Sequence, residues 1–306
     1  MTSSLFFTQL LNGLQLGLLL FLLSAGLTLV FGIMNFVNLA HGSLYMMGAY
    51  FAAAAFRWSG SFVVAGLVAV PATLLLGLLV ERIALAKLYQ RDHLDQVLTT
   101  FGLILIFNEA VRFIWGSASV YMNVPQAQSG TVDLFGLPYS SYRFAIIAVG
   151  TAAGICLYVL IHRTRVGMLI RAGASNAAMV AALGVNTRLL NTLVFGLGAA
   201  LAGFAGLMAG PIFSVQPGMG EPILILTLVV IVTGGVGSVR GAFYGALIVG
   251  IVDTIGRAFL PGILREFLDR AFAQAAGPAI ASMLIYLLMA VVLALRPQGL
   301  FPVKHG

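Results

Sequence analysis

Residues 32–43 of this chain read GIMNFVNLAHGS, and they interrupt sequence that is otherwise continuously apolar. Successive polar residues in the stretch are three apart (Asn35, Asn38 and His41), so a helix would place their side chains on one side. A glycine near each end permits an unwound or sharply bent backbone instead. The fold depends on which of these two arrangements the stretch adopts and on what surrounds it.

The composition places this stretch in a membrane protein. Of the 306 residues, 60% are hydrophobic and 8% are charged, whereas a soluble domain carries about 25% charged residues to cover its core. The apolar residues recur in runs of roughly 20, the length that crosses a hydrocarbon core about 30 Å thick. Each run must be helical, since unpaired backbone groups are costly in lipid. We predict an all-α fold, a polytopic transmembrane helical bundle of about eight or nine segments in a single domain, residues 1–306.

Nine apolar segments are expected, and the second and seventh are the weakest candidates for complete crossings. They lie at 9–32, 36–56, 61–83, 97–115, 143–162, 189–211, 221–236, 240–256 and 279–296. Lysine and arginine mark cytoplasmic loops. We therefore place three basic segments on the cytoplasmic side: 82–96, 163–188 and the tail with Arg296 and Lys304. We place two segments that contain no Lys or Arg on the external side: 116–142 and 212–220. Alternation then puts the N-terminus outside.

One connection, 257–278, fits this scheme poorly, because it should be external yet contains three arginines. We expect Asp253, Glu266 and Asp269 to partner them. The net charge of +7 is otherwise explained by cytoplasmic loops, so we expect no nucleic-acid partner.

An internal repeat joins the first polar stretch to a second one. LTLV at 27–30 is followed after ten residues by His41 and Gly42, and LTLV at 226–229 is followed after ten residues by Arg240 and Gly241. The offset is 199 throughout, and a tyrosine follows at the same distance in both copies. We predict repeat-like parts near 9–83 and 221–296, related by an axis along the membrane normal.

The second stretch, residues 233–241, reads TGGVGSVRG. Each interior glycine costs a helix about 1 kcal/mol relative to alanine, so a break is expected here too. The stretch is not a nucleotide P-loop, which ends in Gly-Lys-Ser/Thr, because neither lysine of the chain follows a glycine. Any ATP must therefore be bound elsewhere than through that motif.

Two interpretations of these stretches remain open. Buried polar groups in a membrane must face a partner, a cavity or the bundle interior. The stretches are either broken helices that line a translocation path or helix–helix interfaces joined by amide hydrogen bonds. The candidate pathway residues are Asn35, Asn38, His41, Gly42, Gly234, Gly235 and Gly237.

A third stretch lies in the basic cytoplasmic segment 163–188. Ser175 suits the N-cap of a helix, residues 177–183 are good helix formers, and Gly184 suits the left-handed position after its end. A helix of about two turns has little stability alone. It is either a surface loop held against its own bundle or a docking helix whose apolar side chains enter a partner's groove, namely Met179, Val180 and Leu183.

The other polar residues indicate no chemistry. Glu109 and Arg112, like Asp253 and Arg257, are spaced to pair along a helix. The four histidines have no metal-ligand spacing, and the single cysteine excludes an intrachain disulfide. We expect no enzymatic activity, no metal and no cofactor.

Residues 32–50, GIMNFVNLAHGSLYMMGAY, resemble the signature of LivH-type permeases, the inner-membrane subunits of branched-chain amino acid ABC importers. The glycines at 234–241 and the ending RPQGLF at 296–301 resemble the same superfamily. Residues 171–186 resemble the segment with which this family contacts its ATPases, which implies a coupling role for Arg171, Ser175, Met179, Leu183, Gly184 and Asn186. The resemblance covers essentially the whole chain.

The resemblance implies an assembly in the bacterial inner membrane. This multi-pass chain and a longer LivM-type homologue would form the pore, two cytoplasmic ATPases would bind ATP, and a periplasmic protein would deliver the amino acid. The expected function is that of a permease subunit translocating Leu, Ile or Val by means of ATP hydrolysis in its partners. Two alternatives remain: a permease of the same superfamily for urea, short amides or other amino acids, and a secondary transporter that works alone.

Overall fold

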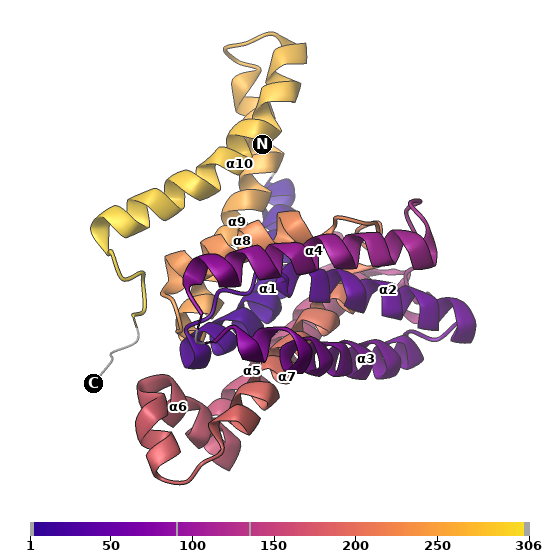
Figure 1. The fold of residues 1–306 in the computed structure, drawn as a ribbon. Helices are drawn as coiled ribbons and strands as arrows, with labels where there is room; N and C mark the ends of the chain where they lie inside the picture. The colour runs from indigo at the N-terminus through magenta and orange to yellow at the C-terminus, as the bar shows by residue number, and fades with distance from the viewer. Residues whose placement is uncertain (1–2, 90, 135, 303–306) are drawn as a thin grey trace.

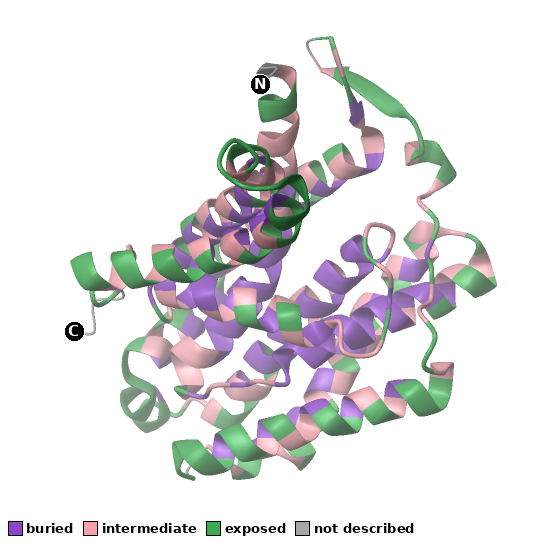
Figure 2. Cartoon of the chain, turned by 90° about the horizontal axis from the view of Figure 1, so that it is seen from above, coloured by how far each residue is buried: buried purple, intermediate pink, exposed green. Residues whose placement is uncertain are grey.

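The computed structural model describes residues 3–89, 91–134 and 136–302, so Lys304 and His305 lie outside the described residues. The described chain is mostly helical (Figure 1), with one short β-hairpin (Figure 2). Its elements are α1 (Ser3–Met34), α2 (His41–Ser59), α3 (Phe62–Ile83), η1 (Leu85–Lys87), α4 (His93–Trp115), η2 (Gln126–Gln128), β1 (Thr131–Leu134), β2 (Leu137–Ser140), α5 (Ser141–Arg163), α6 (Arg165–Ala182), α7 (Thr187–Ala209), α8 (Gly220–Gly234), α9 (Val239–Leu264) and α10 (Arg270–Leu295).

Each predicted apolar segment is a helix, and the remaining helix, α6, lies in the basic connection between α5 and α7. Among the described residues, seven helices are long and apolar enough to cross a membrane: α1, α3, α4, α5, α7, α9 and α10. The other two segments are α2 and α8, the pair predicted to be the weakest crossings. Most of α2 is buried among other helices, so it can use small and polar residues where a lipid-facing helix needs large apolar ones. The polytopic all-α fold is confirmed.

Helix α1 lies at the centre of the packing, and α9 runs antiparallel against it. A Cβ built on Gly13 would lie 2.8 Å from the Cα of Ile251, and one on Gly17 would lie 3.0 Å from the Cα of Leu247. Further along, the rings of Phe21 and Phe243 meet edge to face at 5.1 Å. Membrane helices associate through this kind of close packing at small residues, because lipid is as apolar as the side chains. Figure 2 shows the buried residues concentrated along these central helices.

Helix α7 joins α1, α2 and α3 through glycines. A Cβ on Gly26 of α1 would lie 2.8 Å from the carbonyl oxygen of Gly198. A Cβ on Gly48 of α2 would lie 2.3 Å from the Cα of Gly203, and one on Gly203 would lie 2.5 Å from Thr73 Oγ1 of α3. Three helices therefore converge on Gly203.

The loops gather on two sides of the bundle. On one side, Val120 and Val215 form a bridge between the α4–α5 and α7–α8 connections. Tyr139 donates a hydrogen bond to Asn12 on the same side (3.2 Å), and burial raises the pKa of Tyr139 to about 12, so the phenol stays protonated. The end of α1, the α8–α9 break, α6 and the tail after α10 lie on the other side, and the α1–α2 break runs from that side into the bundle, where Gly42 meets the start of α8. Following the lysines and arginines, we call the two sides external and cytoplasmic.

The α9–α10 connection is shorter than predicted, since α9 continues to Leu264 and α10 begins at Arg270. Arg257 pairs with Asp253 at 2.7 Å, as expected. Within the described residues neither Glu266 nor Asp269 forms an ion pair, so these two expected partners are wrong. Their side chains are exposed at the end of a helical hairpin that stands away from the other helices (Figure 1).

The two stretches of the predicted repeat are broken at corresponding places. Helix α1 ends at Met34 and α2 begins at His41, while α8 ends at Gly234 and α9 begins at Val239. With the offset of 199, the second helices of the two copies begin within one residue of each other. This agreement supports the repeat, which stays a prediction.

We expect Gly203→Ala to destabilise the bundle, because the added Cβ would meet Thr73 at 2.5 Å. Overpacking of this kind costs about 1–3 kcal/mol, so the thermal midpoint of the detergent-solubilised protein should fall. The matched control is Gly102→Ala in α4, where nothing lies within 4 Å of the added Cβ and alanine should be neutral or stabilising by up to about 1 kcal/mol. Equal midpoints for the two variants would contradict the packing described for Gly203.

Candidate translocation path and coupling segment

The first break is a true interruption of the helix. The backbone leaves the helix after Met34, and Asn35 has a φ of 48°, a left-handed conformation that asparagine tolerates better than most residues. Asn38 and His41 are buried, whereas Asn35 is exposed. The three side chains therefore do not form one stripe on a continuous helix, and the unwound arrangement is the correct one.

Asn38 satisfies part of the backbone at this break, and the His41 side chain ties the break to α1. Asn38 Oδ1 accepts a hydrogen bond from the N–H of Ala40 (3.0 Å), and its carbonyl accepts one from the N–H of His41 (3.3 Å). His41 Nε2 lies 3.1 Å from the carbonyl oxygen of Leu23 and is its donor. Asn38 Nδ2 is buried and has no hydrogen-bond partner among the described residues. It is the donor that a polar group entering this part of the bundle would find.

Gly42 follows directly and brings α2 against α8. A Cβ on Gly42 would lie 2.4 Å from the carbonyl oxygen of Gly220, so any larger residue would push the starts of the two helices apart. The first break is thus tied to α1 through His41 and to α8 through Gly42.

The second break contains the predicted glycines. Gly235 and Gly237 have φ values of 113° and 82°, which side-chain-bearing residues rarely adopt. Gly234 packs on Gly241, since a Cβ there would lie 2.2 Å from the Gly241 carbonyl oxygen. Ser238 Oγ accepts a hydrogen bond from the N–H of Gly241 (3.1 Å) and caps α9.

The residues after α10 hold the second break in place, a contact that the sequence did not reveal. The N–H of Leu300 donates to the carbonyl of Thr233 (3.0 Å), and the N–H of Phe301 donates to that of Gly234 (2.9 Å). The Phe301 ring stacks on Tyr244 of α9 at 4.9 Å. The tail thereby supplies donors to the last carbonyls of α8, which have no partner within their own helix.

The two breaks lie close to each other and to the candidate coupling segment, residues 163–188. A Cβ on Gly32, at the end of α1, would lie 3.6 Å from Gly237 in the second break. A Cβ on Gly173 of α6 would lie 3.6 Å from Ile33 and 3.2 Å from Leu190 of α7. The structure therefore brings together, on the cytoplasmic side, three stretches that are far apart in the sequence.

The coupling segment is a bent helix that is longer than predicted. Helix α6 is kinked at Asn176, whose φ of −155° and ψ of 91° are not helical. Asn176 Oδ1 accepts from the N–H of Met179 (2.9 Å), so Asn176 and not Ser175 caps the second part. Both residue types favour this position, and the backbone bends one residue later than predicted. Gly184 has the left-handed φ predicted for it, 84°.

Only part of the predicted docking face is available to a partner. Met179 is 58% exposed and Leu183 is 76% exposed, whereas Val180 is 5% exposed and packs against its own chain. The expectation that Val180 enters a partner's groove is therefore wrong. Arg171 donates to the carbonyl of Ile161 and so ties α6 to the end of α5, and Asn186 caps α7 by accepting from the N–H of Leu189 (3.0 Å).

A buried carboxylate connects the start of α7 to α3. Glu81 is 2% exposed, and its two oxygens accept from the hydroxyls of Tyr89 (2.8 Å) and Thr192 (2.9 Å). Burial, the hydrogen bond and the charge of Glu81 all raise the pKa of Tyr89, which remains a donor. Sequence reasoning missed this contact, because Glu81 and Thr192 are 111 residues apart and neither belongs to a local motif.

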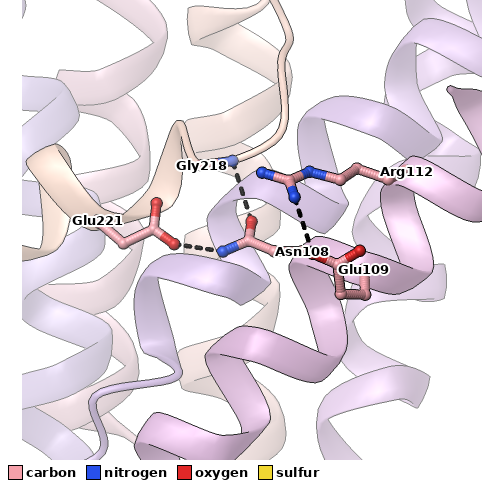
Figure 3. Close-up of polar contacts among 5 residues, drawn as sticks. All are labelled: Asn108, Glu109, Arg112, Gly218 and Glu221. Atoms are coloured by element: carbon pink, nitrogen blue, oxygen red, sulfur yellow. Dashed lines mark hydrogen bonds and ion pairs between the residues drawn. The ribbon is translucent and has the colours of Figure 1, made fainter. Parts of the chain in front are cut away.

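On the external side, Asn108 fixes α4 to the start of α8 (Figure 3). Its Nδ2 donates to Glu221 Oε1 (2.5 Å), and its Oδ1 accepts from the N–H of Gly218 (2.9 Å). Glu221 lies in the first turn of α8, where a negative charge is favourable. Glu109 and Arg112 form the predicted ion pair at 2.8 Å. No group of three or more possible metal ligands occurs among the described residues.

A multi-pass bundle with two helix breaks beside an exposed helical segment is the architecture expected of a membrane permease. The chain belongs to the family described as branched-chain amino acid transport system / permease component, which matches residues 9–293. The resemblance to LivH-type permeases is confirmed.

The chain is 31% identical over 268 residues to the high-affinity branched-chain amino acid transport system permease protein LivH of Escherichia coli K12, covering 83% of this chain and 87% of that protein. It is 28% identical over 310 residues to the corresponding protein BraD of Pseudomonas aeruginosa, covering 95% and 94%. It is 25% identical over 320 residues to LivM of E. coli K12, covering 93% and 68%. No solved structure matches this chain significantly.

We expect Gly235→Ala to release the tail from the second break. Its φ of 113° is strained for alanine, and the added Cβ would lie 2.8 Å from the carbonyl oxygen of Phe301. Hydrogen exchange at the amides of Leu300 and Phe301 should become faster. The control, Gly262→Ala in α9, has nothing within 4 Å of the new Cβ and should leave exchange there unchanged. If both variants exchange like the parent, the tail does not depend on this contact.

Glu81→Gln and Thr192→Val should each lower the thermal midpoint, because a hydrogen bond to a charged group contributes about 1.5–3 kcal/mol. Since both weaken the contact between Glu81 and Thr192, the loss in the double variant should be smaller than the sum of the two single losses. Thr151→Val is the control, as that hydroxyl bonds only within its own helix and is exposed. Additive effects of Glu81→Gln and Thr192→Val would show that the two residues act independently.

Proposed function

We propose that this chain is the membrane-spanning subunit of an ABC importer that carries branched-chain amino acids across the bacterial inner membrane. The observation that carries the proposal is the match of nearly the whole chain to the branched-chain permease family, in a bundle where the coupling segment touches the first helix break. The proposed partners are a LivM-type permease, two cytoplasmic ATPases and a periplasmic substrate-binding protein. The relatives named LivH and LivM support the first of these.

In the proposed mechanism, the ATPases dock on the exposed side chains of Met179 and Leu183. Closure of the ATPases on ATP moves α6, and its contact with Ile33 passes the motion to the end of α1. The unwound residues 35–40 and 235–238 then change their backbone angles, as hinges at helix ends do. Broken helices of this kind are where transporters place their substrate sites.

The proposed cargo is Leu, Ile or Val. An apolar path suits their side chains, while the charged amino and carboxylate groups need polar partners. Asn38 is the side chain that we assign to the carboxylate, because its buried Nδ2 donor has no partner among the described residues. Asn35, Gly42 and the glycines of the second break would shape the path around it.

We expect Met179→Asp combined with Leu183→Asp to abolish ATPase binding, because two charges would replace the two exposed apolar side chains. The ATPases should no longer co-purify with the chain. ATP-driven uptake should fall at least about tenfold, which corresponds to a loss of about 1.4 kcal/mol in the free energy of ATPase binding. Tyr121→Asp is the control, since it is 81% exposed on the external side. Normal co-purification of the doubly substituted chain would contradict docking at this segment.

The test of the whole proposal is uptake of radiolabelled leucine by proteoliposomes. They would contain this chain, its companion permease, both ATPases and the binding protein, with and without ATP. Uptake that needs both ATP and the binding protein is the expected result. Uptake by this chain alone, without ATP, would overturn the mechanism, and an assembly that hydrolyses ATP without importing leucine would point to urea, an amide or another amino acid.

A further inference from the structure

A groove of about 520 Å³ opens between α5 and α9, two of the helices that are long and apolar enough to cross a membrane. Both helices pack on α1, and Phe21 of α1 forms the floor of the groove. Its walls are largely apolar, and Ile155, Tyr158 and Tyr244 are each about half exposed along it (61%, 49% and 48%). Gly154 keeps the groove open, since a Cβ there would lie 3.0 Å from the ring of Phe21.

Positive charge lies at one end of the groove, on the cytoplasmic side. Arg240 lines the groove beside the second break, and His162 faces it from the end of α5. The Arg240 side chain is exposed, and it makes no hydrogen bond or ion pair among the described residues. None of the nine acidic residues of the chain lines the groove. His162 is oriented by its stacking on Tyr158 at 4.2 Å and by the contact of Nδ1 with the Tyr158 carbonyl (3.0 Å).

The dimensions of the groove match one leaflet of a bilayer. Along α5 it extends from Thr151 to His162, about 16 Å at the rise of an α-helix. The hydrocarbon core is about 30 Å thick, so half of it is about 15 Å. A ligand with an apolar chain and an anionic head would therefore place its chain between α5 and α9 and its head at Arg240.

We propose that this groove is a binding site for one anionic phospholipid of the cytoplasmic leaflet. The acyl chain lies on Phe21 and Phe243, and the phosphate pairs with the Arg240 guanidinium. Basic pockets between transmembrane helices on the cytoplasmic side bind anionic lipid headgroups through this combination. Because Arg240 adjoins the second break and Phe301 of the tail lines the same groove, the lipid would also brace the contact between the tail and α8.

The test is native mass spectrometry of the full chain in a non-ionic detergent, titrated with phosphatidylglycerol or with phosphatidylcholine of the same acyl chains. The parent chain should bind phosphatidylglycerol about fivefold more tightly, the ratio that corresponds to about 1 kcal/mol for one basic side chain. Arg240→Gln should abolish this preference and Arg240→Lys should retain it. Arg91→Gln, an exposed cytoplasmic arginine outside the groove, should behave like the parent.

A second measurement locates the lipid. Phosphatidylglycerol with a photoreactive acyl chain should label peptides from 151–162 and 239–244, and Thr151→Phe should block this labelling by filling the apolar end. The proposal is wrong if the parent chain shows no preference between the two lipids, if Arg240→Gln keeps the preference, or if labelling falls elsewhere. Displacement of the lipid by inorganic phosphate alone would also overturn it, because the site would then be one for a free anion.

Discussion

In hydrocarbon, a backbone N–H or C=O without a partner costs several kcal/mol, and this constraint decides how the two helix breaks can exist. At the first break the chain solves the problem locally: Asn38 accepts from the N–H of Ala40 with its side chain and from the N–H of His41 with its carbonyl. The second break is rich in glycine and has few side chains that could accept or donate hydrogen bonds. The backbone N–H groups of the tail bind the carbonyls of Thr233 and Gly234 instead. The same requirement is met once within the break itself and once by a distant piece of backbone.

Close backbone packing allows the two breaks to lie side by side. Gly32, at the end of α1, faces Gly237 in the second break. Gly42, at the other end of the first break, packs on Gly220 at the start of α8 and leaves no room there for a larger side chain. Behind them, the glycines of α1 and α7 hold the central helices together. These contacts replace the hydrophobic effect, which does not drive helices together in lipid. The unwound segments are thereby held by a rigid frame, so a change in their backbone angles need not disturb the rest of the bundle.

The sequence was sufficient for the nine segments, for both breaks and for the ion pairs within one helix, because each depends on neighbouring residues. It was insufficient wherever the partner is distant. The tail contacts α8 through backbone N–H groups, which every residue except proline has. No residue type therefore marks these donors in the sequence, and the contact could not be predicted. Glu81 is likewise an unremarked carboxylate until Thr192 is placed beside it. The coupling segment shows a third limit: Ser175 and Asn176 are both good caps, and only the backbone decides between them.

The contacts of the coupling segment suggest how one movement could act on two parts of the bundle. The first part of α6 is bound to α5 by Arg171 and lies against the end of α1 at Ile33. The helix that follows, α7, is capped by Asn186 and tied to α3 through Thr192 and Glu81. In the proposed mechanism, a force on residues 177–183 therefore acts along the chain in two directions, back through the kink and forward into α7. In one direction the motion reaches the first break through α1. In the other direction it reaches α3 through the buried carboxylate of Glu81, which resists displacement because each of its oxygens accepts a hydrogen bond from a hydroxyl. The break is the softer of the two ends, so the motion is expected to concentrate there.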